Sequence, residues 1–230
     1  MLFDPIIACT AVLLLFAGAR AVSARVGHPP WASPVLLATL AVAVGLAVFG
    51  IAPARFAAAA TPLRWLLGPA LVALALVIFD NRALLRAEAR PVLIAVIGGT
   101  LIGLASAWGL AVALGLPPLL RAALTTKTVT TPFSVAIMTA VGGPVALAAA
   151  FSVLTGVIGA LLVPALFRWL GIASATGRAL GLGVSAHIVG TDWQMRRDAR
   201  AGGLSALAFV LAGLVAALLV PPLWGWLTAA

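Results

Sequence analysis

The chain has 230 residues, of which 64% are apolar and only 8% are charged, and its formal net charge at pH 7 is +9. A soluble domain of this length needs far more polar residues to cover its surface, so the composition excludes an ordinary soluble protein. Thirteen of the fourteen basic residues are arginines scattered in short segments, which is not the pattern of a nucleic-acid-binding surface. We predict an all-α integral membrane protein in the lipid bilayer.

Six apolar windows are candidate membrane spans, since a span needs about 20 residues. In chain order they are 6–19, 35–51, 65–79, 92–116, 145–170 and 204–227. The first window follows Asp4 and precedes Arg20 and Arg25, whereas a cleaved signal peptide carries positive charge before its apolar core. We therefore interpret it as a retained first span with its N-terminus outside.

Two further apolar stretches are interrupted by polar residues and glycines. Residues 117–141 contain T-T-K-T-V-T-T-P at 125–132, which includes the only lysine of the chain. Residues 179–192 are rich in glycine and end in H-I-V-G-T-D at 187–192. Counting both stretches as crossings predicts a polytopic helical bundle of about eight passes with two discontinuous helices. A re-entrant hairpin at the lysine stretch is the alternative.

The arginines give a modest prediction of topology. With the N-terminus outside, inner loops would hold eight of them: Arg20, Arg25, Arg82, Arg86, Arg90, Arg196, Arg197 and Arg200. Outer loops would hold the other five: Arg55, Arg64, Arg121, Arg168 and Arg178. This division agrees with the positive-inside rule. We expect residues 1–230 to form a single transmembrane domain, with N-terminal spans in 1–90 and both interruptions in 91–230.

The two interruptions carry the chemistry that indicates a substrate site. A lysine at mid-membrane costs roughly 2.5–3.5 kcal/mol on insertion scales, and broken helices persist in bilayers only where protein buries them or water fills a cavity. One cation, several hydroxyls and an imidazole suit a small carboxylate with a hydroxyl group. The predicted substrate-binding residues are Lys127, Thr128, Thr130, Thr131, His187, Gly190 and Thr191.

Each of these residues also has a purely structural interpretation. A threonine can bond back to a carbonyl one turn earlier, Lys127 can extend to an interface, and His187 can join two helices. The apolar regions contain no Ser/His/Asp set and no paired carboxylates, so we do not expect an enzyme. The single Cys9 and two distant histidines predict no disulfide and no metal or organic cofactor. Coupling to a proton or another cation is left open.

At both interruptions the sequence resembles the LrgB/CidB family of bacterial membrane proteins. The family signature, roughly P-K-S-V-T-T-P-I-A, corresponds to T-K-T-V-T-T-P-F-S at 126–134. A second signature, roughly A-S-H-x-x-G-T-A, corresponds to S-A-H-I-V-G-T-D at 185–192. The chain departs from the family pattern at Ala186, Asp192 and Ala201. The similarity extends over essentially the whole chain.

The resemblance implies two different functions. Bacterial members are described as holin- or antiholin-like modulators of murein hydrolase export and cell lysis, whereas relatives include a plastidic glycolate/glycerate translocator and proteins linked to pyruvate uptake. We favour a transporter for small monocarboxylates such as glycolate, glycerate, pyruvate or lactate, in the cell (inner) membrane. The resemblance also implies a small LrgA/CidA-type membrane partner and a homo- or hetero-oligomer.

Overall fold

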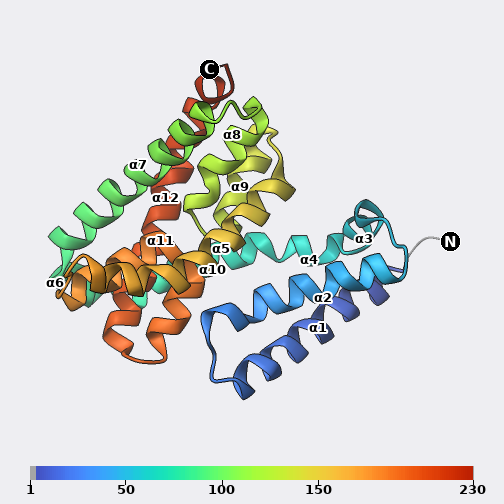
Figure 1. The fold of residues 1–230 in the computed structure, drawn as a ribbon, viewed down its shortest axis with the longest axis horizontal. Coiled ribbons are helices and arrows are strands. Elements are labelled where there is room, and N and C mark those ends of the chain that lie inside the picture. Colours follow the sequence, from blue (N-terminus) through green and yellow to red (C-terminus); the bar gives the residue numbers. More distant parts are fainter. Residues whose placement is uncertain (1–3, 230) are drawn as a thin grey trace. The chain divides into compact units, whose positions relative to one another are not determined.

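The computed structural model describes residues 4–229, and all regular structure in that range is helical (Figure 1). The chain forms two compact units, Met1–Val72 and Ala73–Ala230, and the boundary falls inside helix α5 (Leu67–Asp80). The prediction of a single domain is not tested by this division and stays a prediction.

The first unit is built on two apolar helices that pack against each other, α1 (Pro5–Arg25) and α2 (Pro34–Val48). Their N-termini are set by local capping, because the Asp4 carboxylate accepts the Ile6 N–H at 2.8 Å and the Ser33 hydroxyl accepts the Leu36 N–H at 3.3 Å. Three short helices complete the unit: η1 (Pro30–Ala32), α3 (Pro53–Ala59) and α4 (Thr61–Trp65).

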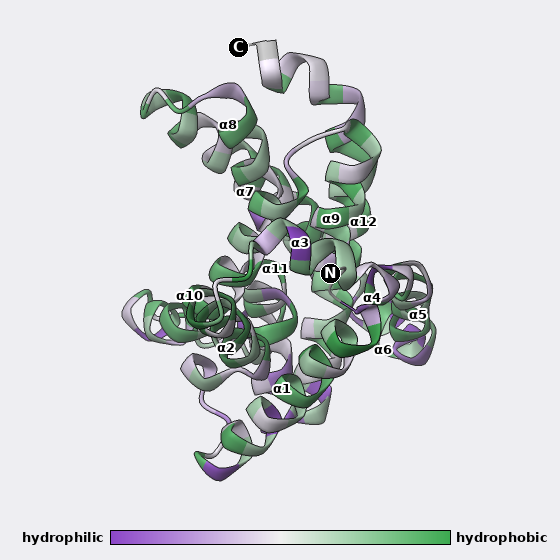
Figure 2. Ribbon diagram, turned by 90° about the vertical axis from the view of Figure 1, so that its right-hand side faces the viewer, coloured by the Kyte–Doolittle hydropathy of each residue, from purple (hydrophilic) through white to green (hydrophobic). Residues whose placement is uncertain are grey.

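Five helical segments have the length and hydropathy of membrane spans: Pro5–Arg25, Thr61–Asp80, Ala89–Ala113, Val145–Trp169 and Ala199–Thr228. The pair α2 and α3, bent by 120°, would add a sixth. Large apolar side chains on these helices point outward, such as Ile102, Leu162 and Leu218, and hydrophobic residues predominate along the ribbon (Figure 2). The prediction of a multi-pass helical membrane protein is confirmed.

The second unit is organised around the long helix α12 (Ala199–Ala229), the most buried of the candidate spans. Helix α7 (Ala89–Ala113) runs parallel to α12: Val96 near its start joins a core cluster with Leu204, and Trp108 near its end stacks on Trp226 at 4.5 Å. Short α6 (Arg82–Ala87) precedes α7. Helix α10 (Val145–Trp169) packs against the segments that contain residues 118–141 and 175–195.

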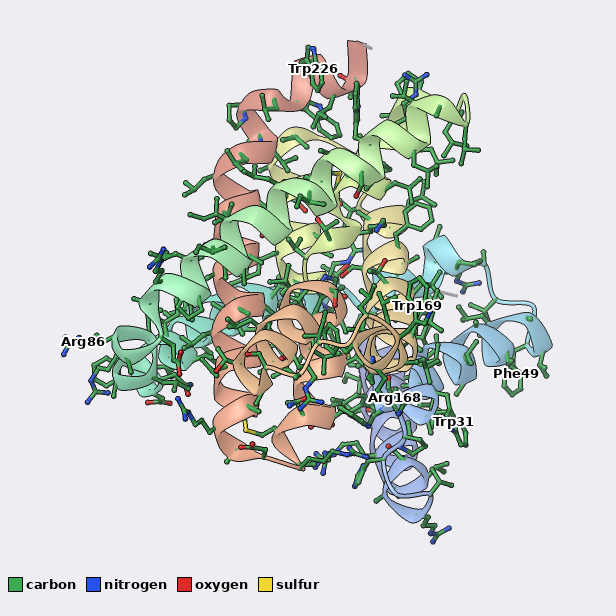
Figure 3. The ribbon with its side chains drawn as sticks, turned by 60° about the vertical axis from the view of Figure 1, so that its left-hand side comes forward. Trp31, Phe49, Arg86, Arg168, Trp169 and Trp226 are labelled. Atoms are coloured by element: carbon green, nitrogen blue, oxygen red, sulfur yellow. The ribbon has the colours of Figure 1, made fainter. Side chains whose placement is uncertain are left out.

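The two ends of this unit differ in chemistry. We call the end where α7 and α12 finish the tryptophan end, because Trp108 and Trp226 meet there. We call the end where α6, α7 and α12 begin the arginine end, where Arg200 forms an ion pair with Glu88 at 2.6 Å. Figure 3 shows Trp226 far from Arg86 and Arg168, which lie toward the arginine end.

Close packing against α12 depends on glycine at particular positions, and Gly183 is the strictest. A Cβ at Gly183 would overlap the carbonyl oxygen of Ser205, whereas a Cβ at Gly98 would meet nothing within 4 Å. We expect Gly183→Ala to destabilise the protein by about 1–3 kcal/mol, because backbone cannot move aside as a side chain can. Gly98→Ala should stabilise it by about 0.5–1 kcal/mol, since alanine is the better helix former.

Thermal unfolding of the purified variants in detergent checks this pair. Equal melting temperatures for the two variants would contradict the packing described for Gly183.

Candidate functional site

The lysine stretch forms a hairpin of two short helices. Helix α8 (Pro118–Thr125) leads into the 3₁₀ turn η2 (Thr126–Thr128), Val129 and Thr130 are extended, and α9 (Thr131–Val141) follows. The Ser134 hydroxyl donates to the Thr126 hydroxyl at 3.0 Å. Eight residues of continuous helix would separate these groups by roughly 12 Å, so the chain has reversed its direction.

Both ends of this first hairpin lie at the tryptophan end of the unit. Helix α8 leaves the end of α7, and the chain reaches the middle of α7 at Thr128, whose methyl carbon would be 3.1 Å from a Cβ at Gly103. Helix α9 then returns alongside α12, and a Cβ at Gly143 would lie 2.8 Å from the Trp224 ring. The tip of the hairpin, η2, therefore lies beside the middle of α7, between the two ends of the unit.

The histidine stretch forms a second hairpin within α11 (Ala175–Met195). His187 has φ 51° and ψ −136°, which interrupts the helix at that residue. A Cβ at Gly190 would be 2.9 Å from Leu182 Cγ, although the two residues are eight apart in the sequence. The arms before and after His187 are thus folded toward each other.

Both arms of this second hairpin pack on the first half of α12. In the arm before His187, Leu180 shares a core cluster with Leu204. In the arm after it, the Thr191 and Ser205 hydroxyls are 2.9 Å apart. The ends of the second hairpin lie at the arginine end, so the two hairpins enter the unit from opposite ends.

Helix α10 holds the tips of both hairpins on one face. The Ser152 hydroxyl donates to the Val129 carbonyl at 2.6 Å, and the Thr131 hydroxyl donates to Ser152 at 3.3 Å. One turn later, a Cβ at Gly156 would be 3.4 Å from the Ala186 carbonyl oxygen. Helix α10 thus contacts both tips: Ser152 bonds to the first hairpin, and Gly156 allows the second to approach closely.

Helix α7 holds the tips from another side. Gly103 faces Thr128 of the first hairpin, and a Cβ at Gly99 would lie 2.9 Å from a Val184 methyl in the second. The hypothesis that the two interruptions face each other is consistent with this arrangement, because both tips lie against the same two helices.

Lys127 and His187 are two polar residues at the hairpin tips for which the described residues provide no side-chain partner. Lys127 is half-buried, and neither ion pair among the described residues includes it. His187 is 2% exposed, and neither of its ring nitrogens has a hydrogen-bond partner among the described residues. Buried polar groups in proteins are nearly always hydrogen-bonded, so His187 is an exception to the usual pattern.

Most of the predicted threonines are engaged within the fold. The Thr128 hydroxyl donates to the Thr125 carbonyl at 3.2 Å, while Thr131 and Thr191 bond to serines as described above. Buried Thr130 precedes α9 and makes no side-chain capping bond. Gly190 provides close packing between the arms of the second hairpin. The two hydroxyls bonded to serines therefore brace the hairpins in this conformation.

The sequence reasoning missed four buried polar residues around the tips. Ser152 and Ser205 bond to predicted site threonines, and Ser134 bonds within the first hairpin. Thr100, 1% exposed on the buried face of α7, has a hydroxyl with no partner. A single serine or threonine in an apolar helix does not stand out in the sequence, because its hydrogen-bond partner depends on which helix it faces. The described residues contain no cluster of three metal-ligating side chains.

These features define a polytopic helical membrane protein with two opposed helical hairpins that meet at a polar centre. The chain matches the model of the LrgB-like family over residues 12–226, and it belongs to that family. The predicted family membership is confirmed.

Its relatives include two uncharacterized proteins of Bacillus subtilis (strain 168). YxaC is 28% identical over 219 residues, which cover 93% of this chain and 95% of the relative. YwbG is 29% identical over 215 residues, with the same coverage of 93% and 95%. The holin-like protein CidB of Staphylococcus aureus (strain N315) is 23% identical over 194 residues, covering 84% of this chain and 85% of the relative. No solved structure matches the chain.

Proposed function

We propose that this protein is a carrier, not an enzyme, for small monocarboxylates of the glycolate, glycerate, pyruvate or lactate type. The observation that carries the proposal is that the tips of both hairpins, one with Lys127 and the other with His187, lie against α7 and α10. Neither ion pair of the described residues includes Lys127, and neither ring nitrogen of His187 has a partner among those residues. A carboxylate would neutralise the lysine, and an adjacent hydroxyl or keto oxygen would bond to the imidazole.

The first hairpin offers further support for an anion. The first turn of α9 carries N–H groups without partners inside the helix, and its N-terminus has partial positive charge. Thr130 and Lys127 lie at this same end of α9. Small anions bind at helix N-termini where side-chain donors add to the backbone groups.

The hairpins also resemble the architecture of secondary transporters, in which paired discontinuous helices meet near the membrane midplane. We propose that both hairpins are re-entrant: each returns to the side of the membrane from which it came. Six spans and two re-entrant hairpins then replace eight crossings.

The arginines support one orientation of the second unit. Its arginine end holds eight of its nine arginines, because Arg168, Arg178 and Arg197 line one cavity there, and Arg121 lies at the opposite end in α8. The positive-inside rule then places the arginine end in the cytoplasm. The eight-pass prediction had put Arg168 and Arg178 on the side opposite Arg197.

Cysteine accessibility tests this orientation. After Cys9→Ser, we expect Arg178→Cys and Arg197→Cys to react with an impermeant maleimide from the same side, and Leu119→Cys from the other side. The physical reason is that both ends of a re-entrant α11 face one aqueous phase. Labelling of Arg178→Cys and Arg197→Cys from opposite sides would show that α11 crosses the membrane.

Uptake of labelled substrate into proteoliposomes tests the carrier. Purified protein should give saturable uptake of glycolate or pyruvate, and an imposed proton or sodium gradient should reveal any coupling ion. Failure of every small monocarboxylate to enter above the rate of empty liposomes would reject the proposal.

The alternative function is a holin- or antiholin-like modulator of murein hydrolase export and cell lysis, which the name of the relative CidB favours. A pore of this kind needs no arranged polar site, and it would release encapsulated dyes from liposomes without saturation. A third case is a subunit that is inactive alone and works only in a hetero-oligomer. Activity would then appear only when a small LrgA/CidA-type protein is reconstituted together with this chain.

A further inference from the structure

A polar cavity lies away from the hairpin tips, in the corner between the two arms of α11 and the end of α10. It encloses about 310 Å³ at the arginine end of the unit. Arg168 enters from α10, Arg178 from the first arm of α11, and Arg197 from just after the second arm. We call it the arginine cavity.

The charges of the arginine cavity are unbalanced. Its one carboxylate, Asp198, is engaged in capping α12, since it accepts the Arg200 and Ala201 N–H groups at 2.9 and 3.1 Å. Neither ion pair of the described residues includes Arg168 or Arg178. Three exposed arginines therefore line a space whose only acidic group is Asp198, which leaves an excess of positive charge.

One guanidinium is held in place by its surroundings. Arg197 donates to the Trp193 carbonyl at 3.1 Å, and its guanidinium carbon lies 3.9 Å from the centre of the Trp193 ring. This contact leaves other donors of the planar guanidinium free, and such groups bind phosphate oxygens in pairs. Phe167 and Leu182 form an apolar wall beside the charged groups.

The positive-inside rule explains why arginines occur at this end, but it does not explain why three of them line one cavity. Arg86 and Arg90 also lie at the arginine end and do not line this cavity. Topology alone needs only charge in the loops. A concave space, three arginines from separate segments and an adjacent apolar wall are the features of a built anion site.

We propose that the arginine cavity binds a phosphate group, carried by an anionic phospholipid or by a soluble phosphate compound. Its three arginines come from the end of α10 and from both arms of the second hairpin, so a bound phosphate ties these segments together. The inference is independent of carboxylate transport.

The thermal stability of the purified full-length protein tests this site. Inorganic phosphate at constant ionic strength, compared with chloride, tests a soluble source, and nanodiscs with phosphatidylglycerol, compared with phosphatidylcholine alone, test a lipid source. We expect a saturable rise in melting temperature in at least one arm. Arg168→Gln combined with Arg178→Gln should weaken the apparent affinity at least tenfold, since a hydrogen bond to a charged group is worth about 1.5–3 kcal/mol.

The control is Arg86→Gln combined with Arg90→Gln, which removes the same charge from the same end. Retention of the effect in this control supports the cavity, and an equal loss in both double variants shows general charge attraction and overturns it. The absence of any saturable rise in the wild-type protein also overturns it, whether or not the double variant folds. Arg197→Lys keeps the charge and should still weaken binding, because an ammonium lacks the paired donors.

Discussion

Replacing Lys127 by alanine should nearly abolish carboxylate uptake. Among the described residues, Lys127 is the only lysine or arginine at the hairpin tips, and a hydrogen bond to a charged group contributes about 1.5–3 kcal/mol, equivalent to roughly 10- to 150-fold in affinity. The measurement is the initial rate of labelled glycolate or pyruvate uptake into proteoliposomes over a range of concentrations.

Two companions make the result specific to position 127. Lys127→Arg keeps the charge and should retain part of the uptake, with weaker apparent affinity, because the longer planar group is displaced. Arg86→Ala removes an exposed arginine far from the tips and should leave uptake unchanged (Figure 3). Wild-type rates in Lys127→Ala would contradict the assignment of this lysine to the substrate.

Replacing His187 by glycine or by alanine should have different effects on stability but the same effect on substrate binding. Its φ of 51° and ψ of −136° belong to a region that is favourable only for glycine and costs other residues about 1–3 kcal/mol. We expect His187→Gly to be more stable than His187→Ala, and to unfold at a higher temperature. The difference in free energy of unfolding should be about 1–2 kcal/mol, after the greater flexibility of unfolded glycine is subtracted. Neither variant should bind substrate well, since both lack the imidazole.

The neighbouring residue supplies a matched control. Ile188 is half exposed and helical, so Ile188→Gly should be less stable than Ile188→Ala by about 0.5–1 kcal/mol, the opposite order. If glycine is also the less stable choice at position 187, His187 is not strained. Full uptake by His187→Gly would show that the imidazole does not contact the substrate.

The strained backbone at His187 agrees with the proposed role of this residue. A glycine would form the same reversal at lower cost, yet the chain has a histidine there, with its ring buried. Strained backbone is maintained where the surrounding structure over-determines it, and such positions cluster at functional sites. The packing of Gly156 against the Ala186 carbonyl shows how α10 helps to hold this tip.

The sequence alone was sufficient to identify a multi-pass helical membrane protein of the LrgB-like family, and it predicted two interrupted helices at Lys127 and His187. Membrane spans are local, because about 20 apolar residues in succession identify them whatever they pack against. The interruptions at Lys127 and His187 were equally local, since a charged residue or an imidazole in an apolar run stands out by composition. The windows at 92–116 and 145–170 correspond closely to α7 and α10.

The reversal of the chain at each interruption became visible in the three-dimensional packing alone. A crossing helix with a break and a re-entrant hairpin share the same hydropathy, and the difference depends on which neighbours satisfy the freed backbone groups. Ser152 does this for Val129, and Gly183 lets the second hairpin approach α12. The same reversal groups Arg178 with Arg197, because long-range packing, which sequence periodicity does not encode, brings the arms of α11 together.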